Sequence, residues 1–530
     1  MVGAASFRLP PRWERVGAGA GRYSGVRVHQ EIEAKLAAAA DVVLPDLGTL
    51  PGVARVEARA PMTLEAVYFD TADLRLARSR MTLRRRTGGR DAGWHLKLPV
   101  SPDSRTEFEA PLGSADDVVP PDLVSLARAR IREVRLAPVA VLTTTRVAHD
   151  LYDAAGRRLA EVSDDGVTAT SLDGRLVDRW REWEVELVEG DRSLLAAVVA
   201  LLTAAGGVPP EWWSKLARAL GQRLPAADAG AARGSISTGS AGAVLRERLR
   251  TQRDELLVRD PLVRRGDPDS VHQMRVASRR VGSALATFRA LEPERSEAVR
   301  AELRWLAGLL GAARDAEVTR LRLTELAARE PADLRDDLAI GRLDEDRVAA
   351  YRAALVELLA GLESTRYFRL LDALDAVVDE PGAADRAQQS AARVLADGVR
   401  REARRLARSL RVALSAPAGP RRDALLHEAR KAAKRTRYAA ETALPVAPRR
   451  AERYARRLEE LQTLLGHHHD TVALRAVLRH VGGEARAAGE DTFSYGRWHA
   501  IEQLEAERAE AAVPVAWKRI RAEGRRHWLH

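Results

Sequence analysis

Hydrophobic and polar residues follow different patterns in the two halves of the chain. Between residues 27 and 220, short segments alternate apolar and polar positions and are separated by turn-forming residues, which is typical of β-strands. From about residue 241 onwards, Leu, Ala, Arg and Glu recur at helical spacing almost to the end of the chain. The patterns predict a multidomain α+β protein with a β-rich first part and an all-α second part.

The alternating segments predict eight short antiparallel strands, and polar residues at every second position favour a closed barrel or tunnel. Two apolar runs of helical spacing, 123–131 and 193–205, interrupt them. The predicted strands span 27–35, 65–70, 82–86, 94–98, 105–109, 139–146, 158–162 and 182–187. We expect a flexible leader at 1–26, a tunnel domain at 27–222, a Gly- and Ala-rich linker at 223–240 and a helical domain at 241–525.

The helical half repeats itself at a constant offset of 155 residues. VHQMRVASRRVGSAL at 271–285 matches LHEARKAAKRTRYAA at 426–440, and LLGAARDAEV at 309–318 matches LLGHHHDTVA at 464–473. A constant offset across separate blocks indicates an internal duplication. We therefore expect two copies of a helical bundle related by a pseudo-twofold axis.

Composition and charge limit the chemistry. The chain has no Cys, which excludes disulfides, Cys-ligated zinc and thiol nucleophiles. The longest apolar run, 194–208, is too short to span a membrane, so we expect a soluble cytoplasmic protein. Residues 1–220 carry 30 basic and 30 acidic side chains, whereas the rest carries 56 and 45, so the net charge of +11 lies in the second half. This asymmetry indicates an anionic partner for the helical half.

Charged residues alternate along several predicted strands. Glu31, Glu33 and Lys35 share one face of a strand, as do Arg84 with Arg86 and Glu184 with Glu186 in theirs. Paired carboxylates suit Mg²⁺ or Mn²⁺, and arginine and lysine suit phosphate oxygens. Together they predict a charged tunnel interior for metal-assisted handling of a polyphosphate.

These motifs resemble the CYTH family, the triphosphate tunnel metalloenzymes. EIEAK at 31–35 is similar to the family's ExExK signature, and blocks at 68–86, 94–99, 105–109, 183–187 and 214–221 follow in the family's order. The resemblance covers about residues 27–222. It implies an eight-stranded antiparallel tunnel that hydrolyses inorganic triphosphate to pyrophosphate and phosphate with Mg²⁺ or Mn²⁺.

The resemblance also implies roles for individual residues. The expected catalytic residues are Lys35, Glu31 and Glu33. The expected metal ligands are Glu31, Glu33, Glu107, Asp164, Glu184 and Glu186, where we favour Asp164 over the neighbouring Glu161 and Asp165. The expected phosphate-binding residues are Lys35, Arg84, Arg86, Lys97, Arg105, Arg146 and Lys215.

The helical half, about 240–525, resembles the CHAD family, which is named for conserved histidines. The resemblance implies binding of inorganic polyphosphate, and thus association with polyphosphate granules. His272, Arg275 and Arg279 share a helix face, as do their counterparts in the second copy, so we expect a cationic groove. The residues expected to bind polyphosphate are His272, Arg275, Arg279, Arg280, His427, Arg430, Lys431, Lys434 and Arg435.

Residues 467–470, HHHD, are of the types that bind metal ions. Successive helical residues point about 100° apart, so three adjacent histidines cannot share one ion. We expect a helix end at Gly466 and one histidine in the cationic groove.

Other functions fit the same patterns. The tunnel is also compatible with a non-catalytic polyphosphate sensor, with a triphosphatase acting on a nucleotide or thiamine triphosphate, and with a nucleotide cyclase. The basic bundle is compatible with nucleic acid, but an aromatic content of 5% without interleaved basic and aromatic residues disfavours that partner.

Overall fold

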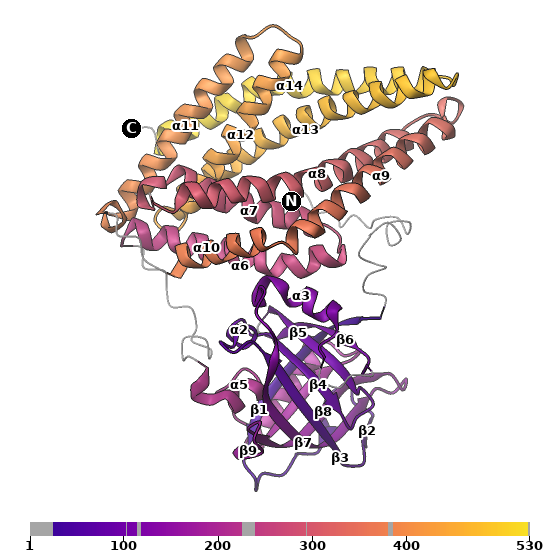
Figure 1. Ribbon diagram of the computed structural model, residues 1–530, viewed down its shortest axis with the longest axis vertical. Coiled ribbons are helices and arrows are strands. Elements are labelled where there is room, and N and C mark those ends of the chain that lie inside the picture. Colours follow the sequence, from indigo (N-terminus) through magenta and orange to yellow (C-terminus); the bar gives the residue numbers. More distant parts are fainter. Residues whose placement is uncertain are drawn as a thin grey trace. The chain divides into compact units, whose positions relative to one another are not determined.

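The computed structural model describes residues 25–101, 103–113, 118–224, 239–292, 294–379 and 385–527 (Figure 1). They form two compact units, a β-barrel within 25–224 and a helical unit within 239–527. Most of the predicted leader, 1–26, and most of the predicted linker, 223–240, lie outside the described residues. Within the described ranges, no helix is both long enough and apolar enough to cross a membrane.

Eight antiparallel strands close into a barrel, which confirms the predicted fold of the first part (Figure 1). Around the ring the order is β7-β3-β4-β5-β6-β1-β9-β8, and β8 pairs with β7 to close it. A short strand that the sequence did not predict, β2, pairs with one end of β7. The strands are β1 Arg27–Ala38, β2 Arg55–Ala58, β3 Met62–Asp70, β4 Thr82–Thr87, β5 Gly93–Ser101, β6 Ser104–Ala110, β7 Ala137–Tyr152, β8 Arg158–Thr170 and β9 Leu176–Leu187.

The register of the strands places charged residues opposite one another. Strand β1 pairs with β6 over its first half and with β9 over its second, so that Glu31 lies opposite Arg105 and Lys35 opposite Glu184. Residues directly opposite in an antiparallel pair share a face of the sheet. The alternating charges of several strands therefore meet on the inner face of the barrel.

The outer face carries the apolar residues, which short helices cover. Helix α4 (Arg192–Ala204) packs on β1 and β9, where Leu36 and Trp183 are buried, and the Asp191 carboxylate caps it by accepting two backbone N–H bonds. Helix α3 (Pro121–Ile131) packs on another outer cluster that includes Trp94. The barrel also carries η2 Leu47–Thr49, α2 Arg75–Arg78, α5 Lys215–Leu220 and η3 Gly221–Arg223. These outer clusters supply the apolar burial that the charged interior cannot.

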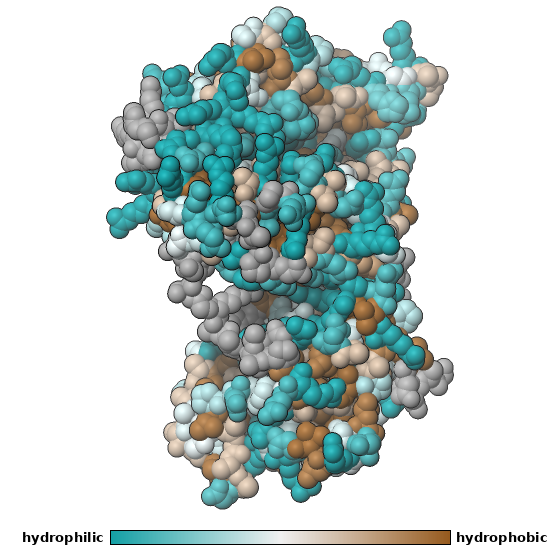
Figure 2. Space-filling model, turned by 60° about the vertical axis from the view of Figure 1, so that its left-hand side comes forward, coloured by the Kyte–Doolittle hydropathy of each residue, from teal (hydrophilic) through white to brown (hydrophobic). Residues whose placement is uncertain are grey.

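The second unit is helical throughout its described residues, as predicted. Its long helices are α6 Ala241–Arg265, α7 Ser270–Thr287, α8 Ser296–Ala328, α9 Asp337–Leu362, α10 Thr365–Asp379, α11 Ala391–Ser415, α12 Pro420–Thr442, α13 Pro448–Ala487 and α14 Phe493–His527. The short ones are η4 Arg289–Leu291, η5 Ala332–Leu334 and η6 Asp385–Gln388. Hydrophilic side chains predominate on the face of this unit seen in Figure 2.

The arrangement of these helices follows the sequence repeat. Within each copy the three helices pack in succession, α6 on α7 and α7 on α8 in the first, α11 on α12 and α12 on α13 in the second. A further long helix packs on the last member of each copy, α9 on α8 and α14 on α13. Helices α7 and α12, which carry the repeated His and basic residues, contact each other.

Candidate active site

The barrel encloses a cavity of about 180 Å³ that is lined almost entirely by charged and polar side chains. They come from alternate positions of the strands, together with the first residues of α5. Every predicted metal or phosphate ligand of the tunnel lines this cavity except Asp164. The lining residues are His29, Glu31, Glu33, Lys35, Tyr68, Thr82, Arg84, Arg86, Asp91, Lys97, Arg105, Glu107, Glu109, Arg146, Glu161, Glu184, Glu186, Ser214 and Lys215.

On one side of the cavity, predicted phosphate ligands are paired with predicted metal ligands. The Lys97 ammonium lies 2.6 Å from Glu31 Oε2, and the Lys35 ammonium lies 2.7 Å from Glu184 Oε1. Glu33 is shared, with Lys35 Nζ at 3.3 Å and Arg105 Nε at 3.2 Å. Burial alone would lower the pKa of Lys97, but nearby carboxylates, Glu107 and Glu31 first, outweigh it and raise that pKa.

A denser cluster lies where α5 reaches the barrel. The Arg146 guanidinium donates to Asp165 at 2.8 and 2.6 Å and to Glu184 at 2.7 Å. The Lys215 ammonium lies within 3.0 Å of carboxylate oxygens of Asp165, Glu182 and Glu184. These carboxylates outweigh the effect of burial and raise the pKa of Lys215, so it stays an ammonium.

The preference for Asp164 is corrected by the structure. Asp164 pairs in register with Trp183 on the outer face and accepts two hydrogen bonds from Arg181, at 2.8 and 2.7 Å. Glu161 lines the cavity, and Asp165 is fully buried against Arg146. The strand is regular here, so the odd-numbered residues face inward and Asp164 faces out.

Other lining residues were missed by sequence reasoning although the signal was available. His29 stands two residues before Glu31, and Glu109 stands two after Glu107, so the spacing of two that identified their neighbours applied to them. Tyr68, by contrast, is uncharged, so the alternation of charges did not identify it. Its hydroxyl accepts from Arg84 Nη1 at 3.5 Å.

Arg84 and Arg86 are the lining cations that keep a buried donor unused. Arg84 has no carboxylate partner among the described residues, and the Nε atoms of both side chains are buried without a hydrogen bond. Arg86 pairs with Asp91, and burial together with the charges of Arg84 and Arg146 lowers the pKa of Arg86 to about 9. A pair of buried guanidiniums with unused donors is suited to the oxygens of a phosphate chain.

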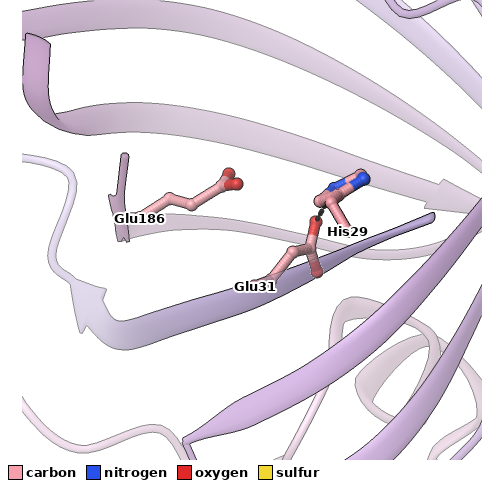
Figure 3. Close-up of side chains that lie close together, drawn as sticks. All are labelled: His29, Glu31 and Glu186. Carbon is pink, nitrogen blue, oxygen red and sulfur yellow. Dashed lines mark ion pairs between the residues drawn. The ribbon is translucent and has the colours of Figure 1, made fainter. Parts of the chain in front are cut away.

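The opposite situation holds at the carboxylate Glu186. Glu186 of β9 points toward Glu31 and His29 of β1, and ligand atoms of the three lie within 4.8 Å of one another (Figure 3). Among the described residues Glu186 has no ion-pair partner, and burial with the nearby carboxylates, Glu31 first, raises the pKa of Glu186 to about 7. Two carboxylates so close together, one of them without an ion pair, form a donor set that fits a divalent ion.

His29 is a positive charge that neutralises the neighbouring carboxylates, so it is not available to bind a metal ion. Hydrogen bonds with Glu107 and Glu31 raise the pKa of His29 to about 10, which keeps both ring nitrogens protonated. His29 Nε2 lies 3.1 Å from Glu107 and 3.6 Å from Glu31. Carboxylate oxygens, which Mg²⁺ and Mn²⁺ prefer, are therefore the better donors here. Glu107 is itself held by His95 Nδ1 at 2.9 Å.

In the helical unit, six of the predicted residues form what we call the basic cluster: His272, Arg275, Arg279, His427, Arg430 and Lys434. Burial and the surrounding guanidiniums lower the pKa of Lys434 to about 6 and that of Arg279 to about 10. Such mutual repulsion would be relieved by an anion.

Glycines of the repeat make room for this cluster. A Cβ on Gly466 would lie 3.4 Å from Arg430 Nη2, and one on Gly311 would lie 3.9 Å from Arg275 Nη2. Both glycines and both arginines are related by the 155-residue offset. Equivalent residues therefore make equivalent approaches in the two copies.

Three other predicted residues pair with glutamates, as the cluster residue Arg275 pairs with Asp315 at 2.9 Å. Arg280 lies 3.2 Å from Glu441, Lys431 is exposed and lies 2.8 Å from Glu428, and Arg435 lies 3.6 Å from Glu402. Arg280 and Arg435 lie outside the basic cluster, whereas Lys431 borders it, because its charge helps to lower the pKa of His427.

The HHHD segment also differs from the expectation. Helix α13 runs unbroken through Gly466, so the predicted helix end is wrong, and the glycine serves the close approach of Arg430. The three histidines diverge: His468 pairs with Asp423 at 3.3 Å, while His469 lies against His427 with ring centroids 4.2 Å apart. His469 thus extends the basic cluster.

Comparison with known proteins agrees with this architecture. Residues 29–219 match the model of the CYTH domain and residues 247–479 that of the CHAD domain. The uncharacterized proteins MT2285 and Rv2226 from two Mycobacterium tuberculosis strains, CDC 1551/Oshkosh and H37Rv, are each 39% identical over 513 residues, which is 93% of this chain and 96% of theirs.

Two solved structures are similar to part of the chain. PptA from Streptomyces chartreusis is 24% identical with a TM-score of 0.45, over 53% of this chain and 99% of its own. A CHAD domain from the plant Ricinus communis is 25% identical with a TM-score of 0.43, over 54% of this chain and 96% of its own.

Proposed function

The chain belongs to the CYTH and CHAD families, and from this premise we propose that its barrel hydrolyses inorganic triphosphate to pyrophosphate and phosphate while its helical unit binds polyphosphate. The observation that carries the proposal is the lining of the barrel, where Arg84 and Arg86 keep unused donors and Glu186 has no ion-pair partner among the described residues. A phosphate chain and a divalent metal ion together satisfy both.

The residues of the barrel divide into two roles. Arg84 and Arg86 have donors free for phosphate oxygens, and Lys35, Lys97, Arg105, Arg146 and Lys215 would exchange carboxylate partners for phosphate ones. Glu31 and Glu186 would hold the metal ion, with Glu33 and Glu184 freed beside them by the same exchange. Mg²⁺ or Mn²⁺ bound there would polarise the phosphoryl oxygens and lower the pKa of a coordinated water.

The cationic residues have a role that is distinct from that of the metal ion. They neutralise the charge of the phosphate chain and fix its position along the tunnel, which is most of what phosphoryl transfer requires of a protein. Lys35 lies between Glu33 and Glu184, so we assign it to phosphate positioning at the step where the leaving pyrophosphate gains charge.

The test is a phosphate-release assay on the full chain. Inorganic triphosphate, ATP, thiamine triphosphate and long polyphosphate are compared with Mg²⁺, with Mn²⁺ and with EDTA. We expect release from inorganic triphosphate to be fastest and to require the metal, because the lining offers charged groups to phosphates and no apolar pocket for a base. Faster release from an organic triphosphate would reject this substrate, and tight metal-dependent binding without release would favour a sensor.

The proposal for the helical unit rests on the basic cluster. Its two rows come from equivalent helices, and the lowered pKa of Lys434 and Arg279 indicates a surplus of positive charge that a polyanion would relieve. A chain of phosphates offers a denser charge than duplex DNA and requires no base recognition.

A further inference from the structure

A second group of arginines surrounds a hollow in the helical unit that shares no residue with the basic cluster. We call it the arginine pocket; it lies where the end of α7 and η4 meet η6 and α11. Its main part is about 440 Å³ and adjoins a second hollow of about 250 Å³. The main part is lined by Ala286, Thr287, Arg289, Ala290, Arg386, Arg401, Glu402, Arg405 and Arg408.

The charge of this pocket is not compensated. Arg386, Arg405 and Arg408 have no carboxylate partner in the ranges that the structure describes. Glu402 is the one acid lining the main part, and its carboxylate lies 3.6 Å from Arg435. The Glu402 Oε2 atom is buried without a hydrogen bond to a described residue, and the five arginines are exposed. Five guanidiniums against one carboxylate still leave a net positive charge, which favours an anion with several charges.

A buried hydroxyl provides an independent sign of a ligand. Thr287 is 1% exposed and lines both hollows, yet its Oγ1 has no hydrogen-bond partner among the described residues. Its counterpart in the second copy, Thr442, donates to the Tyr438 carbonyl at 2.8 Å. A buried polar group without a partner is costly, so an acceptor in the pocket would benefit from this donor.

The two copies differ in how these arginines are paired. At the 155-residue offset Arg405 corresponds to Arg250 and Arg408 to Arg253, which lie 2.7 Å from Glu247 and 2.9 Å from Asp375. Ala286 likewise corresponds to an acid, Glu441. The pocket therefore lacks, among the described residues, the acids that neutralise the equivalent arginines of the other copy.

We propose that the arginine pocket binds a short linear phosphate chain, whether inorganic triphosphate or the triphosphate group of a nucleotide. Arg401, Arg405 and Arg408 are spaced by four and three residues, which places them on one face of α11 along about 10 Å. Guanidiniums in such a row grip successive phosphates by paired N–H donors. The site is separate from the barrel, so its occupancy does not depend on triphosphate hydrolysis.

The natural absence of cysteine allows a local test on the full chain. Ala290→Cys places a single thiol at the rim of the pocket for an environment-sensitive fluorophore. Inorganic triphosphate and ATP are titrated in EDTA, which suppresses metal-dependent turnover. We expect a saturable signal with both ligands and affinities within about threefold, because only the phosphates are gripped.

Matched variants decide the assignment. The triple change Arg401→Gln, Arg405→Gln and Arg408→Gln should weaken the affinity for triphosphate and ATP, measured from the fluorescence, about tenfold or more. Changing three exposed arginines outside the pocket, Arg404, Arg411 and Arg421, to Gln removes the same charge and should change it less than threefold. Alanine at Arg275, Arg279, Arg430 and Lys434 should also leave it unchanged. Equal losses from both triple variants, loss of the signal in the basic-cluster variant, or no saturation with either ligand would overturn the proposal.

Discussion

The Lys97 ammonium lies 2.6 Å from the Glu31 carboxylate, so a predicted phosphate ligand and a predicted metal ligand neutralise each other inside the barrel. Both side chains are largely withdrawn from solvent, and a buried charge that loses its partner costs several kcal/mol. If a phosphate alone bound Lys97, the charge of Glu31 would lose its partner. If a metal ion alone bound Glu31, the charge of Lys97 would lose its partner. The two ligands therefore satisfy the site best together.

The metal carboxylates are the first point to test. Glu31→Gln with Glu33→Gln keeps the size of both side chains but removes the charge that a divalent ion requires. We expect triphosphate hydrolysis at saturating Mg²⁺ or Mn²⁺ to fall about 10³-fold or more. Phosphate release measures this, and circular dichroism checks that the barrel is folded.

The matched control is a pair of exposed acids of the same domain. Glu65→Gln with Glu189→Gln removes the same charge from outward-facing positions and should leave hydrolysis within about twofold. Undiminished turnover in the Glu31/Glu33 variant would reject the proposed metal site.

A second experiment tests the acid that faces inward on β8. Asp165→Asn should reduce hydrolysis strongly, because Asp165 orients both Arg146 and Lys215 from a fully buried position. Asp164→Asn, one residue away, weakens a part-buried pair with Arg181 outside the cavity and should cost about 1.5–3 kcal/mol of stability, with activity retained. Steady-state kinetics and thermal unfolding of the two variants give the comparison. A larger loss of activity in the Asp164 variant would contradict the inward orientation of Asp165.

The inner face of the barrel was predictable because alternation in a strand is strict. Glu31, Glu33 and Lys35 lie where a period of two places them. Alternation alone was ambiguous at 161–165, because acidic residues there occupy both odd and even positions, which face opposite sides of the sheet. The choice there depends on the register of β8 with β7, which sets Asp165 opposite Arg146 and is fixed by tertiary pairing.

The helical unit shows the same limit. His272, Arg275 and Arg279 follow helical spacing, and they do gather with their counterparts. Arg280 and Arg435 directly follow cluster residues in the sequence, and a step of one turns the side chain by about 100°, toward carboxylates contributed by other helices. The arginine pocket was not predictable, because the sequence does not show that α11 faces the end of α7.

The barrel should act without the helical unit. Its three apolar clusters are made of residues between 26 and 224, and every proposed ligand of the cavity lies between 29 and 215. We expect a protein of residues 25–224, which keeps all three clusters, to fold and to hydrolyse triphosphate within about tenfold of the full chain. Phosphate release by the two proteins at equal concentration checks this. Activity confined to the full chain would mean that the helical unit completes the site.

The basic cluster should bind polyphosphate in preference to DNA. Changing Arg275, Arg279, Arg430 and Lys434 to Ala removes the charges that converge from α7 and α12, so most of the affinity for long polyphosphate should be lost. Four arginines changed elsewhere on the same unit should matter much less. Binding is measured at several salt concentrations, where affinity should fall steeply as counterions compete. Equal losses from both sets, or equal affinity for duplex DNA, would indicate a diffuse positive surface.

The last prediction concerns pH. Burial and the charges of Arg430, Arg279 and Arg275 lower the pKa of Lys434 to about 6, with Asp470 opposing them weakly. Above pH 6 the folded protein without ligand lacks a proton on Lys434 that the unfolded chain, with a pKa near 10.5, still binds. The contribution of Lys434 to the free energy of unfolding therefore increases with pH between about 6 and 10.5.

A bound polyanion favours the ammonium and restores that proton. Affinity for polyphosphate should therefore fall as pH rises from 7 to 9, by up to about tenfold per pH unit. Lys434→Met should bind more weakly at pH 7 and lose most of this dependence, whereas the histidines of the cluster have already released their protons in this range. Isothermal titration in two buffers of different ionisation enthalpy would also detect the proton taken up. A pH profile identical in the wild-type chain and in Lys434→Met would show that Lys434 is not the group that titrates.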